Sequence, residues 1–248
     1  MADIQKYRET LNTMLQLAPH DQIQEQAMQL DPSEHLDILR EWQANRLQLT
    51  YHDFLESPRF GPACRFFLED IYAAKDFRQR DYEIKHLYEV MSRFLPDFLL
   101  RLVTRTIELY DLTTTLDETL WSALQQELDV TDTITPELYA EAYRLCDNYQ
   151  ERVHQIELIG EVGHMVEIGT KIPLVGTTLK LASLPARRAG WDDLHAFITR
   201  GYHVFKRMRA ADVFLQEINE REMTILDRIY ARDPQPFEPF LVISYPPE

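Results

Sequence analysis

The stretch that decides the fold is GYHVFKRMRAADVFLQEINEREMTILDRIY, residues 201–230. Its apolar residues recur at alternating steps of four and three, the spacing that keeps side chains on one face of a helix. They are Val204, Met208, Ala211, Leu215, Ile218, Ile225 and Ile229. Glu222 completes the series, and we expect it to be exposed or to have a partner, because unpaired burial of a carboxylate is costly. The stretch predicts about 25 residues of helical packing surface, used either in the core of the domain or in an intermolecular coiled coil.

Apolar spacing in the rest of the chain also predicts helices. The expected helical segments are 34–56, 66–72, 81–94, 96–110, 116–128, 136–168 and 191–200. Residues 172–185 are apolar, are charged only at Lys180 and contain Pro173, Gly176 and Pro185. Membrane-surface contact is one interpretation of that segment, and a buried connection between helices is the favoured one.

Composition supports the same fold class. The chain has 248 residues but only seven glycines, which disfavours turn-rich β architectures. No composition shift or repeat divides it, so we expect one all-α domain over residues 1–248. The expected architecture is a helical bundle of roughly eight to ten helices, with a proline-rich extended tail over residues 233–248.

The compartment is predicted from cysteine usage and from hydropathy. Cys64 and Cys146 lie far apart and form no CxxC pair, which is typical of reduced cysteines in a cytosolic protein. The first residues contain no apolar core of a secretory signal. No apolar run approaches the ~20 residues that span a bilayer. We therefore expect a cytoplasmic protein with no membrane span.

Charge is unevenly distributed along this acidic chain, whose formal net charge is −15. Residues 108–170 contain fourteen Asp and Glu but only Arg144 and Arg152 as basic residues. A negative field of this kind repels phosphate backbones, which disfavours binding to nucleic acid. Solvated helix faces are the simplest interpretation of the acidic stretch, and a docking face for a basic partner or for cations is the alternative.

The only pattern typical of a cofactor site is a pair of ExxH tetrapeptides. Glu83 and His86 form one, and Glu161 and His164 form the other. Ferritin-like di-iron bundles use two such pairs, because carboxylates bridge two cations while imidazoles complete their coordination. The helical spacing, however, places both histidines roughly 130° from the apolar centre of their helices, whereas bundle ligands project inward. We expect no cofactor, and iron or manganese only under this alternative.

A basic cluster lies in the C-terminal third. It consists of Arg187, Arg188, Arg200, Lys206, Arg207 and Arg209. The cluster has the chemistry to receive an anionic ligand, or the acidic middle of another copy of the chain. Intramolecular pairing with that same acidic stretch is the alternative, and such surface pairs contribute only about 0–1 kcal/mol each.

Two segments carry a family resemblance. FFLEDIY at 66–72 with DFRQRD at 76–81, together with GYHVFKRMRAADVFLQEINERE at 201–222, resemble a family of uncharacterised bacterial all-helical proteins. The resemblance implies a bacterial cytosolic protein. It implies no activity and no site residue.

Motifs for nucleotide binding through GxGxxG or GxxxxGK[ST], for GxSxG hydrolases and for HExxH metalloproteases are absent from the sequence. The sequence therefore favours a non-enzymatic protein that binds a protein partner or forms a homodimer. The alternatives are a di-metal carboxylate oxidoreductase that uses the ExxH pairs, and a carrier of an apolar small ligand suggested by the many Phe and Tyr residues around a helical core.

Overall fold

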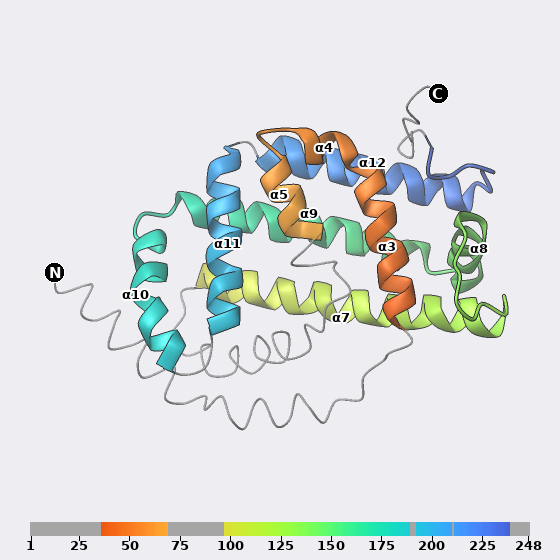
Figure 1. Cartoon of the computed structure of the whole chain (residues 1–248), viewed down its shortest axis with the longest axis horizontal. Coiled ribbons are helices and arrows are strands. Elements are labelled where there is room, and N and C mark those ends of the chain that lie inside the picture. Colours follow the sequence, from red (N-terminus) through yellow and green to blue (C-terminus); the bar gives the residue numbers. More distant parts are fainter. Residues whose placement is uncertain (1–35, 69–96, 189–191, 210, 239–248) are drawn as a thin grey trace. The chain divides into compact units, whose positions relative to one another are not determined.

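The computed structural model describes residues 36–68, 97–188, 192–209 and 211–238 (Figure 1). These residues form nine helices and no strand, which confirms the all-α fold class. The helices are α3 (Leu36–Thr50), α4 (His52–Glu56), α5 (Gly61–Phe66), α7 (Asp97–Gln126), α8 (Pro136–Cys146), α9 (Tyr149–Lys171), α10 (Val175–Arg188), α11 (Asp192–Met208) and α12 (Ala211–Tyr230). The expected helix over 81–94 lies outside the described residues.

The described residues group into two compact units, each assembled from segments that are distant in sequence. Unit 1 contains residues 97–108, 162–188 and 192–209, and therefore holds α10 and α11. Unit 2 contains residues 36–68, 109–161 and 211–238, and therefore holds α3, α4, α5, α8 and α12. Helices α7 and α9 contribute residues to both units. The expectation of a single domain stays a prediction.

The predicted helix over residues 136–168 is two helices. Helix α8 begins as the sequence indicates, because the Thr135 hydroxyl accepts a hydrogen bond from the Leu138 amide at 3.3 Å and Pro136 occupies the first turn. It ends at Cys146, and the next residue, Asp147, has a left-handed φ of 48°. Asp is among the few residues that adopt this conformation without a large penalty, so the break leaves no strong sequence signal.

The opposite error occurs at residues 96–128, where the predicted pair of helices is the single helix α7. Its centre is rich in threonine, which competes for backbone hydrogen bonds in many sequences. Here the hydroxyls of Thr106, Thr115 and Thr119 each donate to the carbonyl four residues earlier. The threonines therefore satisfy their hydroxyls without interrupting the helix.

Residues 172–185 were expected to form a buried connection, and this expectation is wrong, because most of them belong to helix α10. Leu174, with a φ of 77°, ends the preceding turn, and its carbonyl accepts the Thr178 amide at 2.7 Å. Gly176 then allows close packing against α11. An added Cβ at Gly176 would lie 2.7 Å from the Tyr202 hydroxyl oxygen.

The deciding stretch, residues 201–230, also contains a break. Helix α11 ends at Met208, Arg209 has a φ of 60°, and α12 begins at Ala211. The apolar series continues across the break, and Met208, Ala211, Leu215, Ile225 and Ile229 are all buried. The heptad-like spacing correctly identified these five buried residues, whereas Val204 and Ile218 of the same series are half-buried, and it did not reveal that the series belongs to two helices.

The core of unit 2 lies between α3, α7, α8 and α12. Its largest buried side chains include Leu39, Leu120, Leu124, Tyr139 and Ile229. Helix α8 packs against α12. The start of the predicted extended tail joins this core, because Phe237 is only 2% exposed and its ring lies 5.8 Å from that of Trp42.

Helix α4 is fixed to α12 by aromatic and ionic contacts, and the two helices lie together in Figure 1. The Phe54 and Phe214 rings stack with their centroids 5.2 Å apart. Arg221 donates to both carboxylate oxygens of Asp53 at 2.7 Å. These contacts hold α4 against α12.

Within the described ranges, no helix is long and apolar enough to cross a membrane.

Candidate functional site

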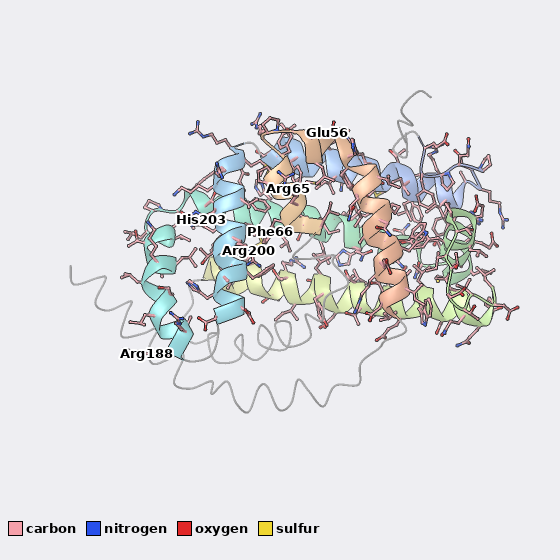
Figure 2. All side chains as sticks on the ribbon, viewed as in Figure 1. Glu56, Arg65, Phe66, Arg188, Arg200 and His203 are labelled. Carbon is pink, nitrogen blue, oxygen red and sulfur yellow. The ribbon has the colours of Figure 1, made fainter. Side chains whose placement is uncertain are left out.

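The predicted basic cluster gathers on one pair of helices in unit 1. Arg187 and Arg188 lie in the last turn of α10, and Arg200, Lys206 and Arg207 lie on α11. Arg209 follows α11 directly. All six side chains are exposed. Figure 2 labels Arg188 at the end of α10 and Arg200 on α11. We call these six residues the basic face.

Packing between α10 and α11 holds the basic face together. Helix α11 is amphipathic, with Tyr202, Phe205 and Met208 buried on one side. The His195 ring nitrogen Nε2 lies 2.8 Å from the Leu179 carbonyl oxygen on α10, and Gly176 admits the Tyr202 ring. Because the apolar side of α11 is used in this packing, its cationic side is presented outward.

The cations of the basic face have little local compensation. Among the described residues, Arg187, Arg188, Lys206, Arg207 and Arg209 form no ion pair; Lys206 instead donates to the Tyr202 hydroxyl at 2.9 Å. The described residues of unit 1 contain ten Lys and Arg against five Asp and Glu. The basic face is therefore a positively charged surface in an otherwise acidic protein.

The acidic stretch is mainly in unit 2, and it is a surface feature. Residues 109–161 contain twelve Asp and Glu, of which ten are exposed. The exceptions are Asp117, which is buried, and Glu141, which is half-buried and pairs with Arg144. Most of this charge is therefore exposed, as both interpretations of the acidic stretch require.

The ExxH residues can be placed only in part. Glu161 and His164 are exposed on α9, and the His164 Nδ1 atom lies 3.8 Å from a carboxylate oxygen of Glu167. Glu83 and His86 lie outside the described residues. The di-metal site therefore stays a prediction.

A buried group of polar side chains in unit 2, the polar centre, was not anticipated. We define it as Gln43, Arg46, Tyr51, Thr113, Asp117, Tyr139, Tyr143, Arg152, Gln155 and Glu222. Arg46 Nη1 donates to both carboxylate oxygens of Glu222, at 2.6 and 2.8 Å. The Tyr51 hydroxyl donates to the same carboxylate at 2.8 Å. Glu222 thus has the partner that its position on the apolar series requires.

The rest of the polar centre links α3, α7, α8 and α9. Gln43 donates to Asp117 Oδ1 at 3.0 Å, and the Tyr139 hydroxyl donates to that of Tyr143 at 3.2 Å. Arg152 donates to the Leu116 carbonyl at 3.1 Å, and its guanidinium carbon lies 4.4 Å from the centre of the Tyr143 ring. These contacts join four helices through side chains that are mostly buried.

Burial controls ionisation in the polar centre. Burial raises the pKa of Asp117, although Arg152 and the Gln43 hydrogen bond act in the opposite direction. Burial also raises the pKa of Tyr139, which keeps the phenol neutral. For Arg46, burial is the largest influence and lowers the pKa, but the charge and hydrogen bonds of Glu222 and the neighbouring Tyr139 and Tyr143 together raise it by more, so the net shift is upward. Burial also lowers the pKa of Arg152, but its neighbours, Tyr143 first among them, together raise that pKa by more. Both arginines are therefore cationic.

A sequence signal for the polar centre does exist. Arg152 precedes Ile156 and Ile159 by four and seven residues, so it lies on the apolar side of α9. Arg46 follows the apolar Leu39 by seven residues, so it lies on the apolar side of α3. A charged residue on an apolar helix face requires a buried partner, but the sequence does not say which one.

One comparison with known proteins gives a match. A family described as a domain of unknown function (DUF8198) matches residues 22–236. No curated protein and no solved structure matches the chain.

Proposed function

We propose that this chain, which belongs to that family of uncharacterised domains, is a non-enzymatic binding protein that self-associates through its basic face. The observation that carries the proposal is the exposed cluster of six cations on α10 and α11, five of which have no ion-pair partner among the described residues. Its occupant is the acidic surface of unit 2 in a second copy of the chain.

Charge complementarity supports this occupant. Ten exposed carboxylates within residues 109–161 give unit 2 a negative surface, and the basic face is positive. Complementary surfaces of this kind steer association and fix which patches meet. Contact between two different patches is heterologous, so it produces closed rings or open chains of copies. A two-fold dimer forms only if the basic face of each copy contacts the acidic surface of the other copy at the same time.

An apolar residue within the basic face adds a hydrophobic contribution. Leu184 lies three and four residues before Arg187 and Arg188, on the same side of α10, and is 55% exposed. Apolar side chains framed by polar ones are typical of contact sites between proteins. The centre of the proposed contact is therefore the C-terminal half of α10.

The test is sedimentation velocity of the purified chain at several concentrations, at about 50 mM and about 500 mM salt. We expect concentration-dependent oligomers at low salt that dissociate at high salt, because the Debye length falls below about 5 Å. The double variant Arg188→Glu with Arg207→Glu should be monomeric. Arg101→Glu with Arg232→Glu is the matched control, since both residues are exposed, lie outside the basic face and give the same change in net charge.

Two results contradict the proposal. One is a monomer at every concentration at low salt. The other is oligomerisation that both double variants weaken equally, because total charge rather than the basic face would then control association.

A further inference from the structure

Unit 2 contains a cavity of about 100 Å³ whose wall includes the polar centre. The wall is built by α3, α7, α8, α9 and α12 together with residues near α5. All of the described residues that line it belong to unit 2. The cavity is independent of the basic face, which belongs to unit 1.

The size of the cavity limits what it can hold. A cavity of roughly 150 Å³ accommodates benzene, and one water molecule occupies about 30 Å³ of liquid. The cavity in unit 2 therefore suits about three waters or a ligand of about four to six non-hydrogen atoms. Nucleotides, sugars and long acyl chains are too large.

The charge of Arg152 indicates the sign of the ligand. Its side chain is only 3% exposed, and no described carboxylate forms an ion pair with it. Two of its nitrogens donate, to Gln155 Oε1 at 3.2 Å and to the Leu116 carbonyl, but Nε is buried and has no hydrogen-bond partner. A buried cation that lacks a counter-ion and retains an unused donor is stabilised by an anion.

Neither carboxylate among the described wall residues forms a hydrogen bond or an ion pair with Arg152. Glu222 is committed to Arg46 through two hydrogen bonds. Asp117 accepts from Gln43; burial raises the pKa of its carboxyl group, and the charge of Arg152 lowers it. Arg46 also has a buried Nε atom without a partner. The wall therefore holds two guanidinium Nε–H groups, on Arg46 and Arg152, that have no acceptor among the described residues.

The remaining wall is apolar, and this separates two classes of small anion. Phe67, Leu68, Ile156, Ile159 and Phe214 are among its lining residues. A phosphate dianion needs polar partners on every side, whereas a carboxylate needs them at one end only. An apolar wall beside a guanidinium is therefore an environment that suits a carboxylate with a hydrocarbon body.

We propose that unit 2 binds a compact organic monocarboxylate in this cavity, with its carboxylate on Arg152 and its hydrocarbon body against the apolar wall. A guanidinium binds a carboxylate through two parallel hydrogen bonds, and Arg152 has the buried Nε group with which to form one of them. The sequence-based alternative of an apolar-ligand carrier thereby becomes more specific: the ligand is small and has a negatively charged end.

The experiment is isothermal titration calorimetry of the full chain with acetate, propionate, butyrate, octanoate and inorganic phosphate. We expect one saturable site that prefers a ligand of four to six non-hydrogen atoms. Octanoate and phosphate should each bind at least tenfold more weakly than the best of these acids, because octanoate exceeds the cavity and phosphate lacks a hydrocarbon body.

Two variants test the assignment within the cavity. Arg152→Lys keeps the charge but loses the planar fork, so the affinity for the best acid should fall at least tenfold. Ile159→Phe keeps Arg152 and fills the cavity, and it should abolish binding of the larger acids first. The matched control is Arg228→Lys, because Arg228 pairs with Asp233 outside the cavity and its replacement should leave the affinity unchanged.

Several results would overturn the proposal. They are the absence of a saturable signal for every short acid, tighter binding of phosphate than of any carboxylate, and unchanged affinity in Ile159→Phe. If Arg152→Lys does not fold, as circular dichroism would show, Ile159→Phe decides alone.

Discussion

Removing the charge of Glu222 should destabilise unit 2 strongly, because it leaves Arg46 buried without its carboxylate. The side chains of Arg46 and Glu222 are 10% and 16% exposed, and Arg46 donates to both carboxylate oxygens. Breaking a buried ion pair by removing one partner costs about 3–5 kcal/mol. Since a small part of each group still reaches solvent, we expect Glu222→Gln to lower the free energy of unfolding by about 3 kcal/mol.

Urea unfolding followed by tryptophan fluorescence measures this loss. Trp42 and Trp121 lie in unit 2, so a Trp191→Phe background leaves only indoles of that unit. With an m-value of about 2 kcal/mol per molar urea, the unfolding midpoint should fall by about 1.5 M. The control is Glu217→Gln, whose side chain is 41% exposed and pairs with Arg221, and it should cost only about 0–1 kcal/mol.

A double variant tests whether the loss of stability comes from leaving one charge buried without its partner. Replacing both residues with apolar ones of similar size, Arg46→Met with Glu222→Leu, should restore stability to within about 1 kcal/mol of wild type or raise it. The reasoning is refuted if Glu222→Gln costs no more than Glu217→Gln, or if the double replacement is as unstable as the single one.

The remaining predictions concern a buried acid and two glycines. The pKa of Asp117 is higher in the folded state than in the unfolded state, where it is about 4. Ionisation of Asp117 therefore lowers the free energy of unfolding as the pH rises above about 4, and the full loss is present above the folded-state pKa. Asp117→Asn keeps an acceptor for Gln43 and should therefore be at least as stable as wild type at pH 7. Its free energy of unfolding should fall less than that of wild type between pH 4 and pH 7. A variant that is less stable than wild type at pH 7 contradicts this. Gly176→Ala should lower the melting temperature, because the new Cβ meets the buried Tyr202 ring and such overpacking costs about 1–3 kcal/mol. Gly160→Ala, whose Cβ would meet no described residue outside its own stretch of helix within 4 Å, should raise the melting temperature through about 1 kcal/mol of helix propensity. Equal shifts for the two variants would contradict the packing argument.

Helix content and buried positions were predictable from the sequence, but several helix boundaries were not. The apolar spacing identified Met208, Ala211 and Leu215 as packing residues whether or not one helix carries them. The boundary between α11 and α12 depends on one backbone dihedral at Arg209, and Arg has no marked preference for that conformation. Periodicity reports which side chains are buried, whereas a single left-handed residue changes the direction of the chain without altering the pattern.

The two candidate sites also differ in how far the sequence predicts them. The basic face was predictable because its residues are close in sequence and carry one sign of charge. The polar centre was not, because its contacts join residues as distant as Arg46 and Glu222, 176 positions apart. The sequence indicates only that Glu222, Arg46 and Arg152 lie on apolar helix faces and need partners. A buried charge on an apolar helix face predicts that a partner exists, and identifying that partner requires the packing of α3 against α12.

The acidic exterior of unit 2 also bears on which anion its cavity takes. Residues 109–161 present ten exposed carboxylates to solvent, so an anion approaches against a negative field. That repulsion scales with ligand charge and is about twice as large for a dianion as for a monoanion. Inside the cavity the dianion gains little in return, because one of the two arginines is already paired with Glu222. The field outside and the charges inside therefore favour the same ligand, a compact monocarboxylate, and its association rate should rise as added salt screens the exterior.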